Sequence, residues 1–338
     1  MLSQRQWLVV AIVFCIGIAA GWEGRTLLWP YIPSIAMTYD NPALRSKDST
    51  YQFISPLLAC ETPERKEVRE FQPLETDINS LIDSAVYRKT AKTASVYFRD
   101  PQKGRWVAIN ENEQYFPASL LKVPIMMAYF KAAESDPRIL SQQLTYDGSF
   151  DDNTRADIKP EKPLAPGKSY SVDELIAAMI TQSDNNATRL LVNNIDKKSL
   201  DEVYTDLGLS IPDTTGNIEF MSVKSYSYFF RVLYNATYLT KPMSDKALLL
   251  LTAHDFPQGI MAGVPDSVKV GQKFGESEIY SDPSTVSSRE LHDCGMVYHP
   301  KNPYLLCSMT KGDNFDDLTR LIQDISRLVY QRVDSSIY

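Results

Sequence analysis

The sequence predicts an α+β fold: one antiparallel sheet flanked by the first and last helices, with a helical subdomain inserted between its strands. Strand patterns stand at both ends of the chain, over residues 93–110 and 268–310, and helical patterns fill the interval. Strands so far apart in the chain can bury their apolar faces by pairing into a single sheet. This layout leaves a cleft between the sheet and the helical block, and we expect the functional site there.

The N-terminal elements are predicted from local periodicity. Residues 75–89 carry apolar side chains at helical spacing, and residues 93–98 and 106–110 are rich in strand formers. The segment 100–104 contains Asp, Pro and Gly, which predicts a turn between the two strands.

The helical block begins at a capping signal. Ser171 followed by Glu174 is a capping box, which predicts a helix from there to about residue 182. Periodicity predicts further helices at 186–195, 199–207, 222–235 and 244–253.

The C-terminal part returns to strands, predicted at residues 268–274, 290–298 and 304–310. A last helix is predicted over residues 314–332, where the apolar residues form one stripe. That stripe would cover the same sheet as the first helix.

Composition excludes several classes of function. The chain of 338 residues has a net charge of −7, which provides no basic face for nucleic acid. It holds three His and four scattered Cys without a Cys-x-x-Cys or His-x-x-x-His pair, so we expect no metal site. We also expect no cofactor and a monomeric protein, and the chemistry must come from hydroxyls, amines and carboxylates.

An apolar run at the N-terminus predicts export. Residues 7–22 are uninterruptedly apolar and follow Arg5; the run is longer than most signal-peptide cores and shorter than the roughly 20 residues that span a bilayer. We expect an uncleaved signal anchor over residues 1–30, with a cleaved signal peptide as the alternative; the position behind a basic residue disfavours a buried core helix. The anchor and the cleaved peptide both place the rest of the protein outside the cytoplasm. In the anchored case the protein is a single-pass protein of the cell membrane whose catalytic domain is periplasmic or at the cell surface.

The rest of the chain divides at about residue 73. Residues 31–73 are mixed in character, with one apolar island at residues 53–58, and we interpret them as a stalk with a short docked segment. Residues 74–338 would form the main domain.

The first candidate for chemistry is Ser119 with Lys122, at the start of an apolar helix. Residues three apart fall on one helix face, so the amine can serve as a base for the hydroxyl if desolvation lowers its pKa. Backbone N–H groups at the helix start would stabilise an oxyanion. Ser-x-x-Lys is also common in ordinary amphipathic helices, and alone it is a weak signal.

Two further motifs follow. Ser183-Asp184-Asn185 offers a hydroxyl that can relay a proton and an amide that can hold a substrate carbonyl, although these are also usual turn residues. Lys273-Phe274-Gly275 lies on a predicted strand, where a lysine facing the cleft supplies positive charge and a glycine permits close backbone approach. A lysine that faces solvent is the ordinary alternative.

Together and in this order, the three motifs resemble those of the penicillin-recognising serine enzymes, and their surroundings are most similar to class A β-lactamases. The similarity spans residues 75–333 and includes segments 259–265, 292–298 and 309–312. It implies a β-lactamase/DD-peptidase-like fold and a small-molecule or peptidoglycan-peptide substrate.

Carried over residue by residue, the resemblance makes Ser119 the acylated nucleophile and Lys122 its proton acceptor. Ser183 would pass the proton to the leaving nitrogen, and Lys273 would bind the substrate carboxylate. Asn185 would contact the substrate's side-chain amide. Phe274, Gly275 and Glu276 would contact the substrate along the strand, with the N–H groups of Glu276 and Ser119 forming the oxyanion hole.

Two departures from the class A pattern bear on function. Phe274 stands where that family carries Thr or Ser, which removes a hydroxyl expected to bind the substrate carboxylate. The family's loop glutamate, which activates the deacylating water, has no counterpart in the short interval 207–222, because Glu219 lacks the expected neighbours. We interpret Glu219 as an acid that favours a helix start.

Three interpretations remain open. Similarity outside the motifs favours a β-lactamase-like hydrolase of a β-lactam or related cyclic or peptide amide, with slow deacylation. A penicillin-binding DD-peptidase that acts on peptidoglycan stem peptides is the second. A low-turnover cell-wall-binding module is the third, and it is disfavoured because binding alone needs no nucleophile–base pair.

Cys294 and Cys307 lie on consecutive predicted strands joined by a turn at about residues 300–303. Opposed Cβ atoms on paired strands are about 4.5–5.5 Å apart, somewhat wider than the roughly 3.5–4.5 Å of a disulfide. A bridge is therefore feasible in an oxidising compartment, with two buried thiols as the alternative.

Overall fold

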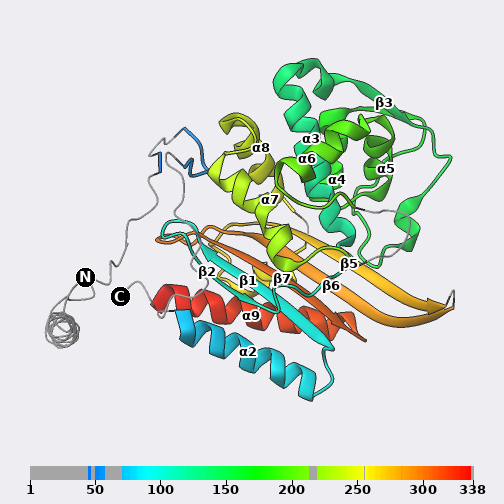
Figure 1. The fold of residues 1–338 in the computed structure, drawn as a ribbon. Helices are drawn as coiled ribbons and strands as arrows, with labels where there is room; N and C mark the ends of the chain where they lie inside the picture. The colour runs from blue at the N-terminus through cyan, green and yellow to red at the C-terminus, as the bar shows by residue number, and fades with distance from the viewer. Residues whose placement is uncertain are drawn as a thin grey trace, which may run out of the picture. The chain divides into compact units, whose positions relative to one another are not determined.

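A five-stranded antiparallel sheet forms the centre of the fold in this computed structural model (Figure 1). The structure describes residues 45–46, 50–57, 71–212, 219–254, 256–282 and 284–335. The strand order is β2-β1-β7-β6-β5. The strands are β1 (Thr93–Asp100), β2 (Arg105–Ile109), β5 (Val270–Asp282), β6 (Thr285–Val297) and β7 (Tyr304–Gly312). The strands from the two ends of the chain meet where β1 pairs with β7, as predicted.

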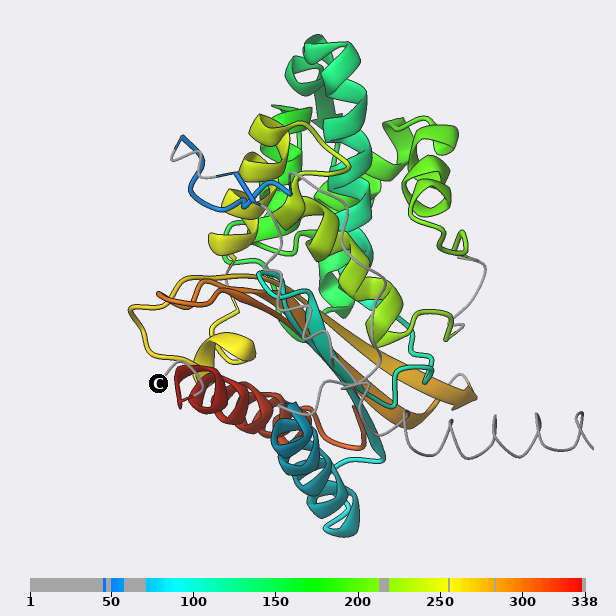
Figure 2. The same cartoon turned by 60° about the vertical axis from the view of Figure 1, so that its left-hand side comes forward.

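The first and last helices of the main domain cover one face of this sheet (Figure 2). They are α2 (Gln72–Tyr87) and α9 (Phe315–Ser335), and the predicted stripe of α9 is buried, including Leu318, Ile322 and Ile325. Burial on a single stripe is what a 3.6-residue period produces when a helix packs on a flat apolar surface.

The helical block lies against the opposite face (Figure 2). Its helices are α3 (Lys122–Ser135), α4 (Val172–Thr181), α5 (Asn185–Asn194), α6 (Lys197–Asp206), α7 (Val223–Asn235) and α8 (Lys241–Thr252). The predicted capping box is present, because Ser171 and Glu174 hydrogen-bond each other's backbone N–H groups at the start of α4. The shorter turns are η3 (Ala118–Leu121), η4 (Pro137–Ser141), η5 (Asp152–Arg155) and η6 (Ile260–Gly263).

The helical block also contains a small hairpin that the sequence did not predict. Strands β3 (Gln143–Tyr146) and β4 (Lys168–Ser171) pair antiparallel as a separate two-stranded sheet. Each has four residues, which is the shortest length at which alternation can be recognised.

The sheet separates two apolar cores because successive side chains of a strand point to opposite faces. On β1, Phe98 belongs to the core under α2 and α9, whereas Tyr97 belongs to the core under the helical block.

Part of the segment before the main domain docks on the helical block. The N–H of Ser55 donates to the carbonyl of Tyr234 at 2.8 Å, and the Arg45 guanidinium donates to the Asn235 side chain at 2.9 Å. Phe53, in the apolar island predicted to dock, is buried. The predicted anchor over residues 1–30 and most of the stalk lie outside the described residues. Among the residues that are described, no helix has the length and apolarity required to cross a membrane.

The bridge between Cys294 and Cys307 is present. The two residues are directly opposed in the register of β6 and β7, with Cα atoms 4.0 Å apart, and both are fully buried. The hairpin geometry expected from the sequence is therefore confirmed.

Candidate active site

Ser119 lies in η3, the single turn that leads into α3. The edge strand β5 passes very close to this turn at Gly275, where an added Cβ would lie 2.6 Å from the carbonyl oxygen of Pro117. A side chain at position 275 would therefore push β5 away. The close approach predicted for this glycine places Ser119 and Glu276 in the lining of one cavity.

Lys122 begins α3, and its side chain is buried. Its ammonium donates to the Ser183 carbonyl at 2.6 Å, to the Ser183 hydroxyl at 3.0 Å and to Oδ1 of Asn185 at 2.7 Å. Burial lowers the pKa of Lys122 from 10.5 to about 7, although Asp184 and Glu276 attract its positive charge. The amine therefore exists in both protonation states near neutral pH.

The Ser183 hydroxyl lies at the centre of the site. It is 3.4 Å from the Ser119 hydroxyl, 3.0 Å from Nζ of Lys122 and 3.1 Å from Nζ of Lys273. Ser183 has a left-handed backbone with φ of +53°, in the turn between α4 and α5. Strained backbone of this kind persists where surrounding contacts hold it.

Asp184 supplies those contacts. Its carboxylate accepts hydrogen bonds from two N–H groups at the start of α5, from the Asn153 side chain and from the N–H of Leu164. The middle residue of the motif thus fixes the turn that presents Ser183, and it faces away from the cavity lining.

Lys273 is fully buried on β5. Its Nζ lies 3.1 Å from the Ser183 hydroxyl, 3.1 Å from Nε2 of His254 and 3.1 Å from the Phe274 carbonyl. Burial, reinforced by Lys122, holds the pKa of Lys273 well below its usual value, and burial with both lysines lowers the pKa of His254. His254 was missed at the sequence level because a lone histidine just after a helix carries no motif.

Two of the other predicted substrate-binding residues, Asn185 and Glu276, line the cavity. The backbone N–H of Asn185 donates to Asn153 at 2.7 Å. The carboxylate of Glu276 accepts from the N–H of Ile158 at 2.9 Å, while burial raises its pKa.

The Phe274 ring does not line the cavity and thus corrects the predicted substrate contact. It is buried on the other face of the sheet and stacks on Phe256 with ring centroids 4.2 Å apart. Strand alternation explains this placement, because Lys273 and Gly275 point toward the helical block and the residue between them points away. The backbone carbonyl of Phe274 accepts from Nζ of Lys273, and that ammonium also lies 4.2 Å from the centroid of the Phe274 ring.

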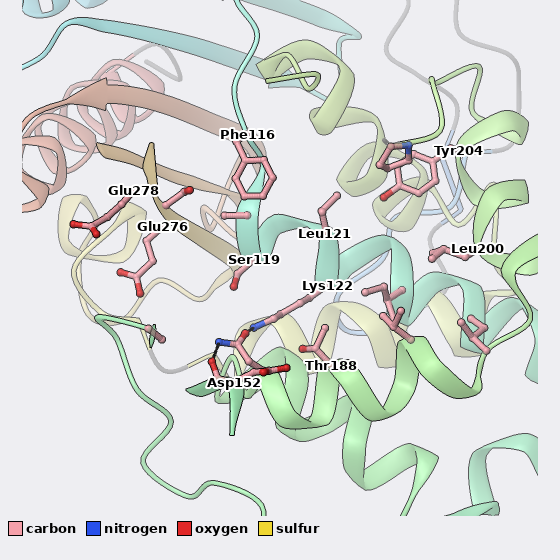
Figure 3. A pocket seen from close by; sticks show the side chains of 18 of the residues that line it. Phe116, Ser119, Leu121, Lys122, Asp152, Thr188, Leu200, Tyr204, Glu276 and Glu278 are labelled. Carbon is pink, nitrogen blue, oxygen red and sulfur yellow. Dashed lines mark hydrogen bonds between the residues drawn. The ribbon is translucent and has the colours of Figure 1, made fainter. Parts of the chain in front are cut away.

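The cavity has a volume of about 830 Å³ and contains Ser119, Lys122, Asn185 and Glu276 in its lining. Figure 3 shows Ser119 and Lys122 between Glu276 and Glu278 on one side and Leu200 and Tyr204 on the other. The Ser119 hydroxyl and the partly neutral amine of Lys122 therefore face a space large enough for a substrate, and the Ser183 hydroxyl contacts both from behind the lining.

Glu219 lies outside the cavity lining and forms an ion pair with Lys311 of β7. The helix-start interpretation of this residue is wrong, because α7 begins at Val223 and is capped by the Ser222 hydroxyl. Its long-range partner could not be read from local sequence. Among the described residues, no group of three or more His, Cys, Asp or Glu is arranged to hold a metal ion.

Comparisons with known proteins identify the family and the fold. The profile described as "Beta-lactamase enzyme family" matches residues 73–333. The structure of PBP-A superposes with a TM-score of 0.65 at 23% identity, covering 82% of this chain and 100% of that one. The class A β-lactamase from Mycobacterium abscessus gives 0.64 at 18% identity, with 77% and 99% covered. The β-lactamase from Sphaerobacter thermophilus gives 0.63 at 18%, with 76% and 96% covered. A comparison with curated proteins finds no match.

Proposed function

The chain belongs to the Beta-lactamase enzyme family and is a serine hydrolase, and from this premise we propose that it is acylated at Ser119 by a β-lactam or a related cyclic or peptide amide and deacylates slowly. The observation that carries the proposal is the position of the Ser183 hydroxyl, within 3.4 Å of Ser119 and within 3.1 Å of both lysine amines.

The acylation step follows from these contacts. Ser119 Oγ attacks the substrate carbonyl carbon, and its proton passes to neutral Lys122, either directly or through the Ser183 hydroxyl. Backbone N–H groups of Ser119 and Glu276 would stabilise the oxyanion. Ser183 then donates a proton to the leaving nitrogen as the C–N bond breaks, and it is reprotonated from the lysines.

Slow deacylation is supported by what surrounds Ser119. In the part of the chain that the structure describes, no carboxylate forms a hydrogen bond or ion pair with Ser119 or Lys122. Among the cavity carboxylates, Asp152 pairs with Arg189, Glu278 pairs with Arg289 and Glu276 accepts the N–H of Ile158. We therefore expect a water molecule that attacks the ester to lack the positioned base that contributes about 10²–10⁴ in rate.

We also propose that the protein is a monomer, that residues 1–30 tether it to the cell membrane, and that its catalytic domain lies outside the cytoplasm. The disulfide between Cys294 and Cys307 supports export, because such bonds persist in oxidising compartments. The apolar run of residues 7–22 supports the tether.

A penicillin-binding DD-peptidase is the second candidate. Among the described residues no carboxylate contacts Ser119 or Lys122, which favours this candidate, because a long-lived penicillin adduct is what such an enzyme would show. One structure of similar fold, with a TM-score of 0.66 and 22% identity, is an acyl-enzyme complex of a PBP-A mutant with penicillin G.

The decisive experiment is intact-protein mass spectrometry after mixing with a penicillin. We expect a stoichiometric adduct on wild type and none on Ser119→Ala, with Ser80→Ala, an exposed serine of α2, as the matched control. An adduct that persists in Ser119→Ala would show that another residue is the nucleophile. Release of D-Ala from a D-Ala-D-Ala peptide would favour the peptidase.

A further inference from the structure

The catalytic cavity has two chemically different ends, with Ser119 and Lys122 between them (Figure 3). At the β5 end the lining includes the carboxylates of Glu276 and Glu278. At the other end, which we call the apolar end, the lining comes from η3, α3, α5 with its C-cap, α6 and the segment after α6. Its members are Leu121, Ile125, Val192, Ile195, Leu200 and Ile211.

Helical spacing makes the apolar end continuous with the catalytic groups. Asn185, Thr188 and Val192 all line the cavity and lie three and four residues apart, so they share one face of α5. Asn185 contacts Lys122, and Val192 lies seven residues further along, about 10 Å at 1.5 Å per residue. The hydroxyl of Thr188 already donates to the Asp184 carbonyl at 2.8 Å. This face therefore extends from the catalytic lysine to an exposed apolar side chain.

Exposed hydrophobic residues gather at this cavity. Six large hydrophobic side chains are exposed among the described residues, and three of them, Val192, Ile211 and Tyr280, line it. Single exposed apolar residues are normal, but their concentration around one concave site is typical of a ligand-binding surface. Lys197 and Asp201 of α6 also line the cavity and carry opposite charges.

We propose that the apolar end binds the acyl group of the substrate, so that the enzyme prefers amides and esters with an extended aliphatic acyl chain. This inference rests on the proposed acylation of Ser119. The leaving group takes its proton from Ser183, which lies between the two lysines and outside the cavity lining. The acyl group stays on Ser119, next to the face of α5 that leads to Val192.

A series of p-nitrophenyl esters with acetyl, butyryl and octanoyl groups tests this with one constant leaving group. Each buried methylene contributes about 0.8 kcal/mol, so even partial burial of the octanoyl chain should raise kcat/KM at least about tenfold over acetyl. Val192→Asp should lower that octanoyl-to-acetyl ratio by about tenfold. The matched control is Val86→Asp on α2, because Val86 is 41% exposed against 42% for Val192 and does not line the cavity.

The outcomes separate the two proposals. Intact mass that shows Ser119 acylated by all three esters at similar rates would overturn the acyl-chain preference and leave the serine hydrolase intact. A ratio that falls equally in Val86→Asp and Val192→Asp would overturn it as well. No adduct on Ser119 from any ester or penicillin would instead remove the proposed acylation itself.

Discussion

At the residue scale, the site depends on two lysines that share one hydroxyl. Lys122 and Lys273 both contact the Ser183 hydroxyl, and the positive charge of Lys122 disfavours the charged form of Lys273. Burial is the largest cause of the lowered pKa of both amines, and it acts on Lys122 against the attraction of Asp184 and Glu276. A buried amine that is partly neutral near pH 7 can accept the serine proton, which a fully protonated surface lysine cannot do.

Acylation should therefore follow the titration of Lys122. The base is the neutral amine, so the acylation rate should rise with pH below about 7 and level off above it. Lys122→Ala should slow acylation by about 10²–10⁴ and remove the rising limb. Stopped-flow measurement of adduct formation from pH 5 to 9 checks both, with Lys131→Ala, an exposed lysine of the same helix, as the control. If the acylation rate of Lys122→Ala still rises with pH in this range, the rise belongs to the titration of another group.

Turnover should be limited by loss of the acyl group. We expect a burst of β-lactam opening equal to the enzyme concentration, followed by weak steady hydrolysis. Glu219→Gln should change the rate of the slow phase by less than about twofold, because Glu219 pairs with Lys311 away from the cavity. The substitution should also leave the fold intact, because a partly exposed ion pair contributes only about 0–1 kcal/mol to stability. Rapid hydrolysis by wild type that Glu219→Gln abolishes would identify Glu219 as the deacylating base.

At the element scale, the site depends on how closely β5 approaches η3 and on the hairpin of β6 and β7, with which β5 pairs. Strand β5 is an edge strand whose partner in the described sheet is β6, and β6 in turn is bonded to β7 by the disulfide. Lys273 pairs in register with Cys294, so the bridge lies directly beside the strand lysine.

Removing the disulfide should lower the free energy of unfolding. The bonded cysteines are 13 residues apart, and closing a loop of about this size contributes about 3 kcal/mol. Urea denaturation of the full chain should shift to lower concentration on adding reductant, and Cys294→Ala/Cys307→Ala should be insensitive to it. A wild-type midpoint that reductant does not move would argue against a stabilising role for this bond.

At the scale of the whole molecule, the chain combines a catalytic domain with an N-terminal segment of different character. We expect the full-length protein to stay in the membrane fraction after alkaline washing, because residues 7–22 are apolar and follow a basic residue. Fractionation followed by N-terminal sequencing checks this. A soluble mature form that begins near residue 21 would show that the segment is a cleaved signal peptide.

The sequence by itself determined the five-stranded sheet with its inserted helices, and it singled out Ser119, Lys122, Ser183 and Lys273, which the structure brings together. These rest on local signals: the capping box at Ser171, the amphipathic stripe of α9, and hydroxyl–amine spacing such as that of Ser119 and Lys122. Such patterns are properties of a few consecutive residues, so they are visible without knowledge of any long-range partner.

Only the tertiary structure decided which side chains reach the cavity and which partners set their charge. Phe274 faces the opposite core, Glu219 pairs with Lys311, and His254 contacts Lys273 across 19 residues of sequence. Each of these depends on strand pairing and on the packing of distant segments, which local patterns do not specify. The apolar end of the cavity has the same origin, because its walls come from helices that are adjacent only after the chain has folded.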